Sequence, residues 1–176
     1  MKIMKKYICL LPLLLLLVGC QQETEPVAVI ETPPELAGMF QRVADDVTGS
    51  IPEIRNQVKP GDEVVFFAKV MGSETPFVEG RALMVVGDEE TITSCDLMSD
   101  DDHCETPWDA CCDTREGILK GIATVQMVGA DGKVLASGLR GVNGLKELSR
   151  VKVQGVVAPL SSEQALVINA TAIEVL

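Results

Sequence analysis

The chain has 176 residues, which suit one domain of ordinary size and leave little room for two. Its formal net charge is −11, and aromatic residues make up 3% of it. An acidic surface with few aromatic side chains repels phosphate groups and offers bases little to stack on, so we expect no binding to DNA or RNA.

The amino terminus predicts export. Residues 1–19 combine a basic start with an apolar run, which is typical of a signal peptide and too short for a transmembrane helix. The sequence Leu17-Val18-Gly19-Cys20 resembles the bacterial lipobox. The resemblance implies that Cys20 becomes the first mature residue and carries diacylglycerol and an acyl chain such as palmitate. Several acyl chains make a stable membrane anchor.

The mature chain is expected in the cell envelope, held to the membrane through the lipid on Cys20. Removal of residues 1–19 leaves 12 basic and 26 acidic residues, a net charge of about −14. Gln21 follows Cys20, and in lipoproteins of Gram-negative bacteria a residue other than aspartate there implies the outer membrane. An envelope protein or a small ligand, neither identified by the sequence, is the further partner expected.

Between the lipid and the folded domain we predict a flexible tether over residues 20–32, because this stretch is polar and contains proline. An amphipathic helix and a connector follow over residues 33–58, with the helix itself over residues 33–48. Apolar residues at helical spacing support it: Leu36, Met39, Phe40, Val43 and Val47. Thr32 and Glu35 have the spacing of a capping box.

Residues 59–176 predict a β domain. Strand-like patterns cover residues 63–71, 77–86, 123–127, 134–136, 151–157 and 165–175. The first and last of these strands resemble those of an OB-fold, a small Greek-key barrel. The expected fold class is therefore mainly β, an OB-fold-like barrel of five to six strands. The helix that usually lies between the third and fourth strands of that fold has no counterpart in the pattern.

A second resemblance covers the cysteines. A PFVEGRA strand precedes a cysteine and the motif C-x-T-P-W-D-x-C-C, followed by ATVQ and NAT, as in small uncharacterised exported proteins of environmental bacteria. The matching residues are Pro76 to Ala82, Cys95, Cys104, Thr106, Pro107, Trp108, Asp109, Cys111, Cys112, Ala123 to Gln126 and Asn169 to Thr171. This resemblance supports the fold and the cysteine pattern and implies no activity.

The cysteine-rich insertion, residues 90–120, is predicted to hold two disulfides. Cys95, Cys104, Cys111 and Cys112 are an even set in an exported chain, and export means an oxidising compartment. Adjacent cysteines pair with each other only through a strained ring. We therefore expect one of the vicinal pair to bond Cys95 and the other to bond Cys104, and the sequence does not choose between the two crossings.

A metal site is the alternative for the same insertion. Zinc or copper could bind Cys95, His103, Cys104, Cys111 and Cys112, although eight, six and no intervening residues match no common zinc spacing. No C-x-x-C redox pair is present. The run of Asp100, Asp101 and Asp102 lacks the spacing of a calcium loop and is more typical of a solvated face. Trp108 is expected to form the small core of the insertion.

No catalytic motif is visible, and the single histidine limits histidine-dependent mechanisms. The sequence predicts a non-catalytic, lipid-anchored envelope protein that serves as an interaction or structural module. The first alternative is an envelope metal-binding protein. The second is an oligonucleotide- or oligosaccharide-binding OB domain, which rests only on the fold.

Overall fold

The structure is a computed structural model that describes residues 30–98 and 104–176. The predicted signal peptide over residues 1–19, the lipidation residue Cys20 and the first part of the tether lie outside the described residues. So do Asp100, Asp101, Asp102 and His103.

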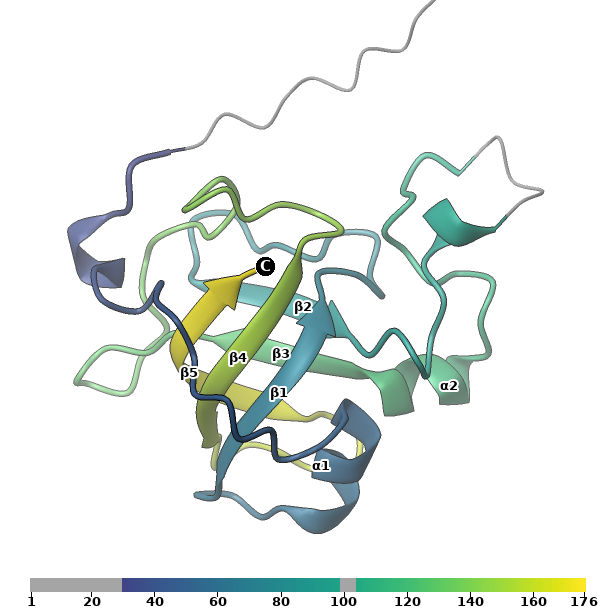
Figure 1. The fold of residues 1–176 in the computed structure, drawn as a ribbon, viewed down its shortest axis with the longest axis horizontal. Coiled ribbons are helices and arrows are strands. Elements are labelled where there is room, and N and C mark those ends of the chain that lie inside the picture. The colour runs from purple at the N-terminus through teal and green to yellow at the C-terminus, as the bar shows by residue number, and fades with distance from the viewer. Residues whose placement is uncertain (1–29, 99–103) are drawn as a thin grey trace, which may run out of the picture.

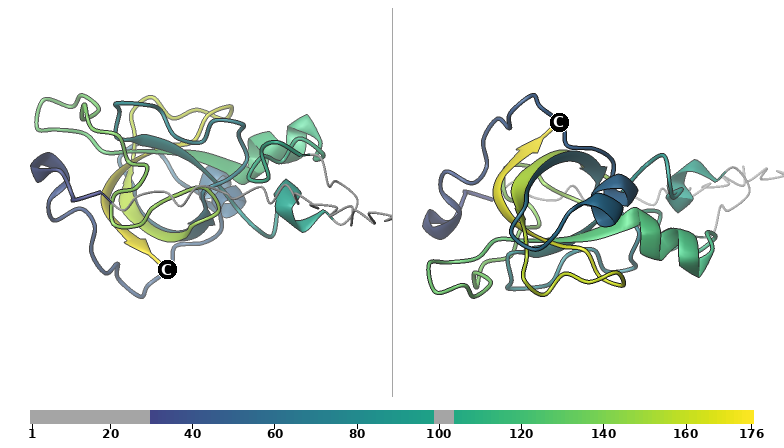
Figure 2. Two further views of the ribbon diagram at one scale, coloured as in Figure 1. Left: turned by 90° about the horizontal axis from the view of Figure 1, so that it is seen from above. Right: turned by 90° about the horizontal axis from the view of Figure 1, so that it is seen from below.

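Five strands close into a barrel, which Figure 2 shows end-on. The strands are β1 (Glu63–Lys69), β2 (Leu83–Gly87), β3 (Ile122–Gln126), β4 (Arg150–Val157) and β5 (Val167–Val175). Their order around the barrel is β1-β2-β3-β5-β4. Pairing is antiparallel except between β3 and β5, which run parallel. The prediction of a mainly β, OB-like small barrel is confirmed.

Alternation along the strands fills the barrel. In β1, Val64 and Phe66 are almost fully buried, whereas Phe67 between the buried positions is half exposed. The same inward pattern is followed by Met84 and Val86 of β2 and by Val151 and Val153 of β4. These residues share one hydrophobic cluster, which is the main core of the domain.

The prediction of a helix over residues 33–48 is wrong. Only a 3-10 turn forms there, at Pro34–Leu36, and Gly38 follows with a φ of +82°, outside the helical region. The chain then runs beside β5: Phe40 forms a bridge with Ile173, and the Gln41 amide donates to the Ile173 carbonyl at 3.1 Å. Tertiary pairing with the sheet has overridden the helical pattern.

The first helix, α1 (Ile51–Gln57), begins later, where a capping box is present. The Ser50 hydroxyl accepts from the Glu53 amide, and the Glu53 carboxylate accepts from the Ser50 amide. Pro52 lies in the first turn, where its missing N–H costs nothing. Pro52 therefore belongs to the start of α1 and not to the end of a preceding helix.

Two further short helices lie in the cysteine-rich insertion between β2 and β3, at one side of the barrel (Figure 1). They are the 3-10 turn η2 (Cys95–Leu97) and α2 (Arg115–Gly121). Thr114 caps α2, since its hydroxyl accepts from the Gly117 amide at 3.1 Å. Sequence reasoning missed α2, which is seven residues long and contains two glycines.

Two predicted strands are shorter than expected. Residues 77–82 form a turn attached through a single bridge between Phe77 and Met84, and residues 134–136 contribute only the bridge between Val128 and Val134. The stretch 127–149 between β3 and β4 is described throughout and holds no helix, as predicted. No helix of the described residues is long and apolar enough to span a bilayer.

Candidate functional site

The cysteine-rich insertion has a small core of its own. Met71, Ile92 and Ala110 are buried together, and Ile118 and Ile122 pack against them. This second cluster lies between the end of β1 and the insertion, so the insertion is fixed to the barrel by apolar contact.

Backbone hydrogen bonds join the two halves of the insertion. The Cys95 amide donates to the Asp109 carbonyl at 2.8 Å, and the Asp96 amide donates to the Pro107 carbonyl at 2.9 Å. A side chain adds a third link, because the Asp113 carboxylate accepts from the Thr93 amide at 2.7 Å. These bonds bring Cys95 beside the segment that carries Cys111 and Cys112.

A buried lysine ties η2 to the barrel. Lys69 ends β1, and its ammonium group donates to the Ser94 hydroxyl at 2.9 Å and pairs with the Asp96 carboxylate at 3.4 Å. Its side chain is only 8% exposed, so the charge depends on these partners. Lys69 therefore holds the turn that positions the Cys95 thiol.

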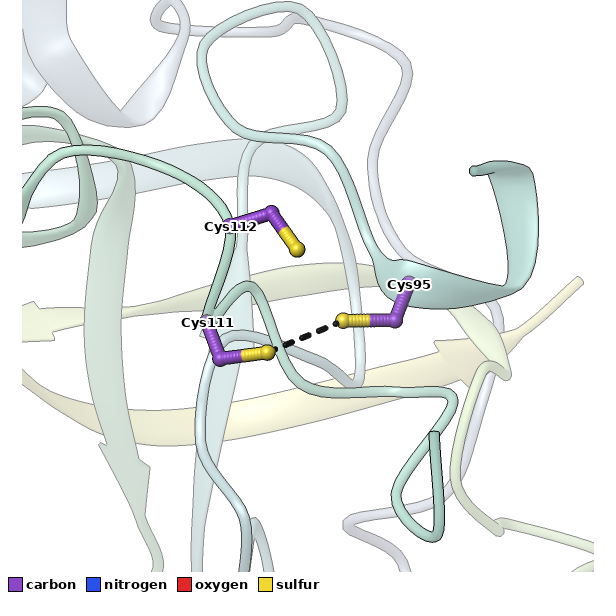
Figure 3. Close-up of side chains that lie close together, drawn as sticks. All are labelled: Cys95, Cys111 and Cys112. Carbon is purple, nitrogen blue, oxygen red and sulfur yellow. Dashed lines mark hydrogen bonds between the residues drawn. The ribbon is translucent and has the colours of Figure 1, made fainter. Parts of the chain in front are cut away.

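The thiols converge on one point. The Sγ atoms of Cys95 and Cys111 are 3.5 Å apart, and those of Cys95, Cys111 and Cys112 all lie within 4.8 Å of one another. Figure 3 shows the three sulfur atoms turned toward a common centre. The Cys104 thiol is not one of these three and is directed at the Thr106 carbonyl, which it approaches at 3.4 Å.

The four thiols differ in environment. Cys95 is buried, and burial followed by its hydrogen bond with Cys111 raises its pKa to about 12. The pKa of Cys104 is lowered, first by a hydrogen bond with the backbone of Thr106 and then by its interaction with Cys95. Cys111 and Cys112 are exposed. The vicinal pair therefore forms the solvent-facing side of the group.

The structure bears on the two predicted chemistries in different ways. It forms no disulfide between the described cysteines, so the two predicted disulfides stay a prediction. Of the five residues named as a metal set, it brings Cys95, Cys111 and Cys112 together. Cys104 contacts the Thr106 carbonyl, and His103 lies outside the described residues. Spacing along the chain gives no sign that Cys95 meets both members of the vicinal pair.

A groove lies next to the cysteine group, with a volume of about 580 Å³. Three stretches far apart in sequence form its walls: the β1–β2 connection at 74–80, the insertion at Trp108, and the β3–β4 connection at 137–147. Ile30 closes one end, where its amide donates to the Gly141 carbonyl at 3.0 Å. The volume falls within the range of small-molecule sites.

Trp108 belongs to the cysteine-rich insertion and attaches it to the β1–β2 connection beside the groove. Its indole N–H donates to the Glu74 carbonyl at 2.9 Å, and its own carbonyl accepts from the Gly72 amide at 2.9 Å. The ring is half-buried and lines the groove, and it is not part of the cluster around Ile92. The expectation that Trp108 forms the core of the insertion is therefore wrong, because Met71, Ile92 and Ala110 fill that core.

The groove combines apolar walls with acidic groups. Phe77, Val78 and Trp108 supply apolar surface, while Glu74 and Glu79 supply carboxylates. Two further charges are neutralised within the protein, since Arg140 pairs with Glu147 at 2.8 Å. A ligand with an apolar face and hydrogen-bond donors fits this lining, whereas a polyanion does not.

Comparison of the chain with protein-family models, with curated proteins and with solved structures finds no match. Function is therefore inferred from the residues and their arrangement.

Proposed function

We propose that this chain is a non-catalytic, lipid-anchored envelope protein whose barrel presents a binding groove. The observation that carries the proposal is the groove itself, walled by Trp108, Phe77 and Val78 and edged by carboxylates. The lipobox-like sequence before Cys20 supports the anchor. A mature domain that is tethered to a membrane by lipid stays at the surface of that membrane. This position suits a protein that binds components of the cell envelope.

Oligosaccharides are the ligand class that this groove favours. Aromatic faces stack on the apolar faces of sugar rings, and carboxylates accept hydrogen bonds from hydroxyl groups. Single-stranded nucleic acid is disfavoured, because its phosphates would meet Glu74 and Glu79 and a mature charge of about −14. The β1–β2 connection that forms one wall is one of the loops with which OB-folds contact their ligands.

A titration with the single tryptophan as reporter tests the groove, because Trp108 is the only tryptophan in the chain. A tetramer of N-acetylglucosamine is one probe, its deacetylated cationic form the second, and single-stranded DNA the third. We expect the emission of Trp108 to shift with at least one of the two sugars and to stay unchanged with DNA.

Two phenylalanine variants localise the effect. Phe77→Ala removes part of the groove wall and should weaken sugar binding about fivefold or more, a loss of roughly 1 kcal/mol. Phe67→Ala removes an exposed phenylalanine outside the groove and should leave the affinity unchanged. Unchanged Trp108 emission with both sugars, or equal losses in the two variants, would contradict the assignment.

A further inference from the structure

We propose that Cys95, Cys104, Cys111 and Cys112 bind one thiophilic d¹⁰ cation, Zn²⁺ or Cu⁺, through their sulfur atoms. The proposal concerns a site separate from the groove and does not depend on what the groove binds. Thiolates are the ligands that both cations favour.

The sulfur positions match a metal–thiolate geometry. With a zinc–sulfur distance of about 2.3 Å, tetrahedral geometry places neighbouring sulfur atoms about 3.8 Å apart. The Sγ atoms of Cys95 and Cys111 are 3.5 Å apart, and Cys112 completes a triangle whose sides are all within 4.8 Å. We assign the fourth sulfur to Cys104 of the same insertion, whose thiol contacts the Thr106 carbonyl at 3.4 Å in this structure.

The surrounding structure holds these ligands in place. Cys95 is fixed by its amide bond to Asp109, and the turn that carries it is held by the Lys69 ammonium through Ser94 and Asp96. The cluster of Met71, Ile92 and Ala110 fixes the insertion to the barrel by apolar contact. Such outer partners orient metal ligands and reduce the cost of ordering them on binding.

Three carboxylates of the described part of the insertion are occupied by the protein. Asp109 accepts from the Ala110 amide at 2.8 Å, Asp113 accepts from the Thr93 amide, and Asp96 pairs with Lys69. A hard cation such as Ca²⁺ would need several of these oxygens at once. The sulfur atoms are the group directed at a common point, so the geometry selects a soft or borderline cation.

Binding replaces thiol protons by the metal. Each cysteine that coordinates loses its S–H proton to the solvent and forms a sulfur–metal bond, with no change of oxidation state. The competing chemistry is oxidation of the same thiols to two disulfides, which removes four hydrogen atoms and leaves no thiolate for a metal. The two outcomes differ in mass and in metal content.

The experiment starts from the full-length protein solubilised from envelope membranes under argon. Native mass spectrometry and elemental analysis should find one zinc or copper ion for each chain. After chelation, the two cations are distinguished by titrating Zn²⁺ alone and, in a second arm, Cu⁺ against a chromophoric chelator. Cobalt substitution of the zinc form should give the charge-transfer absorption of a tetrahedral thiolate site.

Single substitutions then test the ligands. Cys95→Ser or Cys111→Ser should weaken binding by at least about 100-fold, because loss of even an outer partner costs about 10- to 100-fold. Met98→Leu is the matched control: it replaces an exposed thioether of the same insertion and should keep wild-type affinity. If a serine variant fails to fold, alkylation of the wild-type protein is used in place of that variant. The metal should protect all four thiols from alkylation, and all four should be modified after chelation.

Two disulfides in the freshly solubilised protein, seen as a mass lower by four hydrogen atoms, would overturn the proposal. So would reduced protein that takes up neither Zn²⁺ nor Cu⁺ in the titrations.

Discussion

Phe66→Ala should destabilise the domain by about 3–5 kcal/mol, a large part of the stability of a domain of this size. Phe66 is fully buried in the barrel core, so truncation leaves a cavity that the closed sheet has little freedom to fill. The expected result is a much lower midpoint in urea unfolding followed by circular dichroism. Phe66→Leu, which keeps most of the volume, should cost much less.

Its neighbour in β1 provides the matched control. Phe67 is 50% exposed, and its ring lies 5.1 Å from the Lys152 ammonium. The Lys152 side chain is itself only 6% exposed, so Phe67→Ala should cost about 1–2 kcal/mol, still well below the loss expected for Phe66→Ala. Equal losses in the two variants would mean that β1 does not present Phe66 to the core, which would contradict this orientation of the strand in the barrel.

Cys20→Ala should abolish lipid attachment. In the lipoprotein that we propose, the thiol of this residue carries the lipid, and the enzyme that cuts lipoprotein signals acts on the modified cysteine. Without the thiol we expect no incorporation of an alkyne-labelled fatty acid and accumulation of the uncut precursor. The measurement is metabolic labelling followed by separation of membrane and soluble fractions.

Cys9→Ala is the control for that experiment, since Cys9 lies within the predicted signal sequence and would be removed with it. This variant should be labelled and processed like the wild type. Lipid labelling of the Cys20→Ala variant at the wild-type level would contradict the assignment of the anchor.

The strands are predictable from alternation in β1 and from runs of β-branched residues in β4 and β5. Val64 and Phe66 alternate with less buried neighbours in β1, whereas Val151, Lys152 and Val153 of β4 are buried in succession. The prediction of a helix over residues 33–48 fails because apolar residues at helical spacing also fit a segment laid against β5. The decisive contact there, the pairing of Phe40 with Ile173, joins residues far apart in sequence.

Local signals could have located α1. Ser50 and Glu53 have capping-box spacing and Pro52 suits a first turn, so the sequence indicates where the helix starts. For α2, the capping residue Thr114 is the only comparable signal. The longer apolar pattern over residues 33–48 obscures these short signals in the sequence.

The candidate site is only partly predictable. The sequence marks the four cysteines, but their meeting depends on η2 and on the bonds from Cys95 to Asp109 and from Thr93 to Asp113. The groove is out of reach of sequence reasoning, because its walls come from three separate connections and its position is set by barrel closure. Trp108 is unusual in the sequence, and only the fold shows that it faces the groove.

The intact mass of the protein extracted from envelope membranes tests the central claim, a lipid-anchored envelope protein, most directly. The predicted result is the mass of residues 20–176 plus diacylglycerol and an acyl chain, with fragmentation placing the addition on Cys20. A mature chain that begins elsewhere, or one that begins at Cys20 and carries no lipid, would contradict the claim.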